Sequence, residues 1–118
     1  MNGIVRAFAL VALTSLPLLA EAQVPISVWG SGGFSCGDWL EDTKREVSRI
    51  QYTEWMLGFL TSFNYYNRNN QVRPPDRASV SAWIDKYCRD NPLHQQFMAA
   101  AALVEELGGP KAPHPWKR

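Results

Sequence analysis

Hydrophobic residues in the middle of the chain recur every three or four positions. The apolar positions are Tyr52, Trp55, Met56, Phe59, Leu60, Phe63 and Tyr66. This period places them on one face of an α-helix. Thr43 and Glu46 have the spacing of a capping box, so we expect the helix to begin there and to run to about Asn67. Gly58 costs helix stability, which predicts a close approach by a second helix at this position.

Shorter apolar patterns lie on both sides of this helix. The segment CGDWLED at 36–42 predicts a short helix capped by Asp38, with Trp39 and Leu40 facing inward. The polar, proline-containing segment 67–79 predicts a surface loop. Asp76 or Ser79 would then cap a third helix. One face of that helix carries Val80, Trp83, Ile84, Tyr87 and Cys88.

The last apolar pattern predicts a fourth helix over 92–107. Its inward positions are Leu93, Phe97, Ala100, Val104 and Leu107. The alanines at 99–102 give it a narrow face that suits close packing, and Gly108 with Gly109 would end it. The pattern as a whole predicts an all-α fold, a small bundle of about four helices.

The N-terminal segment has the layout of a secretory signal. A basic residue, Arg6, precedes an apolar run of about 14 residues, and Ala20 and Ala22 stand two apart, as a signal peptidase requires. The run is shorter than the roughly 20 residues of a membrane-spanning helix, so we expect no stable membrane anchor. The sequence predicts a signal peptide at 1–22, a flexible lead-in at 23–35, a helical domain at 36–108 and a disordered tail at 109–118. The location is then periplasmic or secreted.

Export decides the interpretation of the two cysteines. An even number of cysteines in an oxidising compartment predicts one disulfide, between Cys36 and Cys88. Closing a loop of this length would stabilise the fold by roughly 4 kcal/mol. A free catalytic thiol lacks support, because no histidine is assigned beside either cysteine. The nearly neutral charge, +1 for the whole chain, gives no sign of a nucleic-acid surface.

The sequence offers few groups for catalysis. His94 and His114 are the only histidines, and neither belongs to a zinc-binding motif. The adjacent acidic pairs at 41–42 and 105–106 diverge on a helix and cannot share a proton-transfer site. We therefore expect no catalytic residues, no metal site, no cofactor and no enzymatic activity.

Aromatic residues are abundant, and they have two interpretations. The first is that the aromatic stripe is the core of the bundle. The second is that part of it binds other proteins, either when the core opens or as an exposed patch. The residues proposed for such a surface are Trp55, Met56, Phe59, Phe63 and Trp83.

The segments SCGDWLED, YTEWMLGFLTSFN and VSAWIDKYCRDNPLHQQF resemble the HdeA/HdeB family of periplasmic acid-stress chaperones. The similarity covers about residues 35–104. It implies a small helical protein with one disulfide that binds acid-unfolded clients. At low pH the carboxylates lose their charge while lysine and arginine keep theirs, so self-repulsion would loosen the bundle. The loop between the middle helices and the proline-rich end depart from the chaperone pattern.

The stretches GFLTSFN and WIDKYC also resemble small periplasmic immunity proteins of the Tai type. This resemblance implies tight binding of one exported toxin or hydrolase. Both resemblances give other proteins as the partners, and a homodimer is a possible form. The choice between the two functions stays open at this point.

Overall fold

The computed structural model describes residues 25–111, so the predicted signal peptide and most of the predicted tail lie outside the described residues. Within this range the elements are η1 (Gly30–Gly33, a 3-10 helix), α1 (Cys36–Asp42), α2 (Glu46–Tyr66), α3 (Arg77–Asp90) and α4 (Gln96–Glu106). The described residues form no β-strand and contain one isolated bridge, Ser35 to Gln95. The prediction of an all-α bundle of four helices is confirmed.

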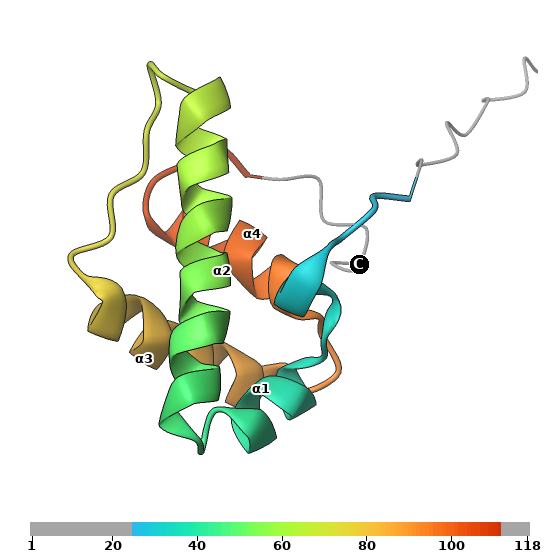
Figure 1. Ribbon diagram of the computed structural model, residues 1–118. Coiled ribbons are helices and arrows are strands. Elements are labelled where there is room, and N and C mark those ends of the chain that lie inside the picture. The colour runs from blue at the N-terminus through green and yellow to red at the C-terminus, as the bar shows by residue number, and fades with distance from the viewer. Residues whose placement is uncertain (1–24, 112–118) are drawn as a thin grey trace, which may run out of the picture.

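The long helix α2 is the centre of the fold. It packs against η1, α1, α3 and α4, and in Figure 1 α3 crosses behind it. The core is formed by apolar residues of all four helices and of the loop after α2. Those least exposed include Trp39, Met56, Val72, Val80, Ile84 and Ala99. The predicted inward positions Val80, Ile84 and Cys88 of α3 are all buried.

A disulfide joins the start of α1 to the end of α3. Cys36 and Cys88 are bonded, their Cα atoms are 4.8 Å apart, and neither residue is exposed to solvent. The predicted pairing is therefore confirmed. Because the bond connects residues 52 positions apart, it links the first and third helices covalently across the core.

The backbone N–H groups in the first turn of α1 find hydrogen-bond acceptors in two parts of the chain. Ser35 and Asp38 form a capping box, in which the Ser35 hydroxyl accepts from the Asp38 amide and the Asp38 carboxylate accepts from the Ser35 amide. The next two amides donate across the fold, Cys36 to the His94 carbonyl at 2.7 Å and Gly37 to the Pro92 carbonyl at 3.2 Å. The first four backbone N–H groups of a helix have no acceptor within the helix, and these hydrogen bonds provide an acceptor for each of them.

This arrangement corrects the predicted start of α4. Residues 92–95 are not helical, because the carbonyls of Pro92 and His94 accept from α1 and Gln95 forms the bridge to Ser35. The helix begins at Gln96, and Leu93, predicted to face inward, is 92 % exposed. The predicted end is confirmed: Gly108 has a φ of +88°, and the Gly109 amide donates to the Val104 carbonyl.

The predicted capping box at the start of α2 is wrong. Thr43 follows the end of α1, and its hydroxyl donates to the Trp39 carbonyl at 2.5 Å instead of accepting from the start of α2. Arg45 occupies the N-cap position of α2 and provides no side-chain cap. The side chain of Thr43 is thus used to close the preceding helix.

Two further expectations for α2 are wrong. Gly58 faces solvent, and a Cβ atom added to it would meet nothing within 4 Å, so no helix approaches it. Tyr66, at the end of the stripe, is 80 % exposed. The helix projects past its neighbours at this end, as Figure 1 shows.

The loop between α2 and α3 is held in place by one amide side chain. Asn64 donates to the Val72 carbonyl at 2.9 Å and accepts from the Val72 amide at 2.8 Å. Val72 itself is buried in the core. Asp76, one of the two caps that the sequence predicted, caps α3 by accepting from the Ser79 amide at 2.7 Å.

The last part of the segment that precedes α1 packs against the helices. Residues 30–33 form η1, which contacts both α2 and α4. Gly32 is buried against the indole of Trp55, whose ring atom would lie 2.0 Å from an added Cβ. Packing of the domain therefore starts before Cys36, within the segment 23–35 that the sequence predicted to be flexible.

Candidate functional site

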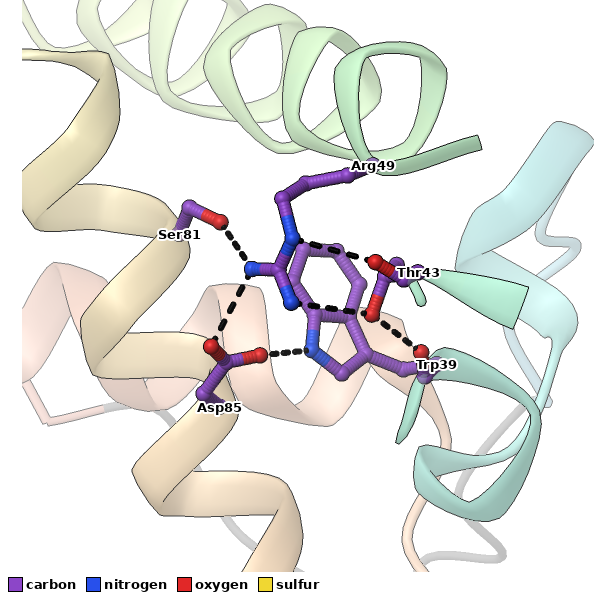
Figure 2. Close-up of polar contacts among 5 residues, drawn as sticks. All are labelled: Trp39, Thr43, Arg49, Ser81 and Asp85. Carbon is purple, nitrogen blue, oxygen red and sulfur yellow. Dashed lines mark hydrogen bonds and ion pairs between the residues drawn. The ribbon is translucent and has the colours of Figure 1, made fainter. Parts of the chain in front are cut away.

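A polar cluster lies where α1, α2 and α3 meet (Figure 2). Asp85 of α3 accepts from the Trp39 indole N–H of α1 at 2.8 Å through one oxygen and from Arg49 of α2 at 3.1 Å through the other. One carboxylate thus binds two other helices. Its side chain is 23 % exposed, so solvent screens this ion pair less than it screens a pair on the open surface.

Arg49 uses most of its donors inside this cluster. It donates to the Ser81 hydroxyl at 2.6 Å and to the Thr43 carbonyl at 3.2 Å, besides the bond to Asp85. Its guanidinium carbon lies 5.9 Å from the centre of the Trp39 ring, close enough for a cation–π contact. Figure 2 shows the guanidinium bonded to Ser81, Asp85 and Thr43 beside the Trp39 ring, while 37 % of the Arg49 side chain stays exposed. Because the cluster connects α1, α2 and α3, it is a structural joint of the fold.

A second carboxylate connects α1 with α2. The Tyr52 hydroxyl donates to Asp42 at 2.6 Å. This hydrogen bond, with burial and the negative charge of Asp42 itself, raises the pKa of Tyr52 to about 12. Two aspartates, Asp42 and Asp85, therefore connect α1 to α2 and α3 in addition to the disulfide.

The residues predicted to form a client surface lie in different environments. Met56 is fully buried, while Trp55, Phe59 and Phe63 are half-buried on α2. Trp55 and Phe59 contact each other, with ring centres 5.8 Å apart. The Trp55 indole donates to the Trp29 carbonyl at 2.8 Å, which fixes the segment before η1 over it.

Trp83 belongs to a different part of the surface. It stacks on Tyr87, one turn further along α3, with ring centres 5.4 Å apart and planes 21° apart. The two surface clefts that it lines are built from α3, α4 and nearby loops and include no residue of α2. The structure brings together Trp55 and Phe59, but it gives Trp83 other neighbours.

Sequence reasoning missed the apolar groups that the folded protein exposes. These are Ile26, Trp29, Phe34, Val47, Ile50, Tyr65, Tyr66 and Leu93. Ile50 borders an open cleft of about 420 Å³ between α2 and α3, whose floor includes the small residues Ala78 and Ala82. Trp29 and Phe34 lie in the segment predicted to be flexible, so no helical periodicity identified them.

Sequence reasoning also missed the Asp85 cluster. Its five members come from α1, the turn after it, α2 and α3, so no short motif contains them. No local signal singled out Asp85, because α3 carries several other charged residues.

Titratable groups are spread thinly over the described residues. Among residues 25–111, no group of three or more histidine, cysteine, aspartate or glutamate side chains is placed to hold a metal ion. His94 bonds through its ring Nδ1 to the Tyr87 hydroxyl at 2.8 Å. Burial, together with the charge of Glu105, raises the pKa of Tyr87. This arrangement suits packing between α3 and the start of α4.

The fold and the site define a class of protein, a small all-α domain with one internal disulfide. Polar side chains connect its helices, and its aromatic side chains are partly buried in the bundle and partly exposed on its surface. No helix in the described part of the chain has the length and apolar character needed to cross a membrane. Comparison with known proteins gave no matching family model, no matching curated protein and no matching solved structure.

Proposed function

We propose that the protein is an exported acid-stress chaperone, of the kind the HdeA/HdeB family represents, which binds unfolding proteins when its bundle opens at low pH. The observation that supports this most is the position of Asp85. One carboxylate holds α1 and α2 against α3 through two charge-assisted hydrogen bonds. Neutralising this one carboxylate would weaken both bonds together, because charge-assisted hydrogen bonds are the stronger kind.

A second carboxylate acts in the same direction. The amide of Ser79 bonds the Asp76 carboxylate and so lowers the pKa of that group below its ordinary value of 3.8. A lowered pKa in the folded state means that the contribution to stability is present above about pH 3.8 and is lost as the pH falls through the folded value. The start of α3 therefore also weakens in acid.

The closed bundle buries the apolar side chains that would bind a client protein. Met56 is fully buried, and Trp55, Phe59 and Phe63 are half-buried, so opening α2 exposes large aromatic groups. The disulfide keeps α1 bonded to α3 meanwhile, which limits the expansion of the opened chain. Reclosing on return to neutral pH would then release the client.

The test is suppression of client aggregation, followed by light scattering at about pH 3, where most carboxylates are protonated. The wild type should reduce scattering at pH 3 and have no effect at pH 7. Asp85→Asn removes the charge permanently and should move the onset of activity to higher pH. The matched control is Asp90→Asn, whose carboxylate pairs with the exposed Lys86. Unchanged scattering with the wild type at pH 3 would refute the proposal.

A second function, that of an immunity or inhibitor protein, is favoured by the apolar groups already exposed in the closed fold. Trp29, Tyr65 and Tyr66 are exposed by 84, 62 and 80 %. Such residues commonly form the energetic centre of protein interfaces. This function requires binding of one exported hydrolase at pH 7, which Tyr65→Ala with Tyr66→Ala should weaken at least tenfold. Calorimetry with candidate hydrolases distinguishes it from chaperone activity, which is absent at pH 7.

A further inference from the structure

A groove with two chemically different halves crosses the surface formed by α3 and α4. Two clefts, of about 390 and 210 Å³, adjoin there and share Trp83 and Glu106. The larger cleft is also lined by Tyr87, Glu105 and Lys111, and the smaller by Pro74, Pro75 and Leu107. One half is aromatic and carries two carboxylates against one lysine, and we call it the acidic half; the other half is largely apolar.

The acidic half suits a cationic side chain. Trp83 and Tyr87 stack with their ring centres 5.4 Å apart, and Glu105 and Glu106 stand next to them on α4. The faces of aromatic rings attract cations, and adjacent carboxylates strengthen that attraction.

The apolar half suits a proline-rich segment. Its walls are the rings of Pro74, Pro75 and Trp83 together with Leu103 and Leu107 of α4. Grooves lined by aromatic residues bind extended, proline-rich peptides, because such peptides lose little conformational entropy when they dock. The groove as a whole therefore fits a peptide with prolines and basic residues in close succession.

The chain itself contains a peptide of this composition. The seven residues after Lys111 read APHPWKR, with two prolines, a tryptophan, two permanently cationic residues and no carboxylate side chain. Lys111 lines the acidic half of the groove, so the segment starts where the groove is. Seven residues reach at most about 25 Å, enough to extend over both halves.

We propose that residues 112–118 bind in the α3–α4 groove of their own chain, with Lys117 and Arg118 paired with Glu105 and Glu106 and Trp116 packed against the proline-lined half. This inference is independent of the proposed function. Tethering favours such binding, because a short linker gives an effective concentration on the order of millimolar. Even a weak contact is then largely formed.

The first experiment compares the full chain with a chain that ends at Lys111, using ¹H–¹⁵N NMR spectra. Deletion should shift the Trp83 indole signal and the amide signals of Tyr87 and Glu106. The variant Lys117→Glu with Arg118→Glu should reproduce these shifts without shortening the chain. Shifts confined to residues 108–111, with Trp83 and Tyr87 unchanged, would overturn the proposal.

The second experiment adds the synthetic peptide APHPWKR to the chain that ends at Lys111. Peptide up to several millimolar should move the Trp83 and Tyr87 signals back toward their positions in the full chain, matching the effective concentration of the tether. Glu105→Gln with Glu106→Gln should weaken the peptide roughly three- to tenfold, as expected for two exposed ion pairs. The matched control, Glu41→Gln with Glu46→Gln on α1 and α2, should leave the affinity unchanged.

Two outcomes would contradict the proposal. Equal affinity for APHPWKR and for the peptide APHPWEE would show that charge does not select the segment. Trp83 shifts in the full chain that vanish on dilution would show that a second copy supplies the segment instead. A Trp83 signal independent of concentration between about 10 and 500 µM supports binding within one chain.

Discussion

At the junction of α1 with α3 and α4, the chain is joined by a disulfide and by main-chain hydrogen bonds, whereas the aromatic face of α2 is joined to its neighbours by side-chain contacts alone. Cys36 bonds Cys88, and its amide donates to the His94 carbonyl. Trp55, in contrast, is covered by η1 through its packing on Gly32 and one hydrogen bond to Trp29. The first region stays assembled when side chains rearrange, and the second does not.

This difference locates where the fold can open. Protonation, substitution or partner binding acts on side chains and leaves the covalent link unaffected. The α2 face therefore separates at lower cost than the junction that contains the disulfide. The polar joints at Asp85 and Asp42 stand between the two regions, since they connect α1 and α3 with α2.

The largest expected effect comes from removing the covalent link. Cys36→Ala with Cys88→Ala should lower the free energy of unfolding by roughly 4 kcal/mol, because the unfolded chain regains the freedom of a 52-residue loop. Urea unfolding followed by far-UV circular dichroism measures this. If the double variant is as stable as the wild type, the α1–α3 junction does not depend on its covalent bond, and the comparison fails.

The next effect concerns the joint at Asp85. Asp85→Ala removes the acceptor of both Trp39 and Arg49 and should cost about 2–3 kcal/mol, because two donors lose a charged partner. Asp90→Ala, at an exposed pair, is the control and should change stability by less than about 0.5 kcal/mol. Equal losses for the two variants would mean that the three-helix joint contributes no more than a surface ion pair.

Two glycine substitutions test the cover over Trp55. Gly32→Ala places a Cβ atom where the Trp55 ring lies and should destabilise the fold by about 1–3 kcal/mol, since the indole must move. Gly58→Ala meets open space on an exposed helix face and should stabilise by about 0.5–1 kcal/mol. Thermal unfolding of the two variants measures both changes in stability. A neutral Gly32→Ala variant would show that η1 is not held against α2.

The smallest effect is an alkaline titration. Tyr52 should ionise with a midpoint near pH 12 in the folded protein, compared with about 10 in an unfolded chain, because Asp42 accepts its proton in a hydrogen bond. A raised folded pKa means that this stabilisation is complete below pH 10 and disappears as the pH rises through 12. Absorbance at 295 nm, with Tyr52→Phe as the reference, measures it. A midpoint near 10 would show that the Tyr52–Asp42 bond is absent in solution.

Several elements followed directly from local sequence patterns. The apolar spacing from Tyr52 to Phe63 predicted α2, and Val80, Ile84 and Cys88 predicted the inner face of α3. The Asp76 cap and the glycine end of α4 were also predicted. Each of these depends on residues within one or two turns, where propensity and periodicity operate.

The errors share one physical cause, which is competition from partners far along the chain. The sequence predicted that residues 92–95 are helical, but the carbonyls of Pro92 and His94 bind the first amides of α1, so α4 starts later. Thr43 has the spacing of a cap, but its hydroxyl closes α1. Gly58 suggested a close helix, but that side of α2 faces solvent.

The sequence by itself determined the class of fold and the disulfide pairing, because hydrophobic period and a single pair of cysteines leave few alternatives. Only the tertiary structure decided which aromatic side chains are buried and which are exposed. It also decided which carboxylate hydrogen-bonds residues of two other helices. Asp85, Arg49 and Trp39 are adjacent because the disulfide and the core fix the angles between α1, α2 and α3. Such angles depend on the packing of all side chains at once, and no local pattern encodes them.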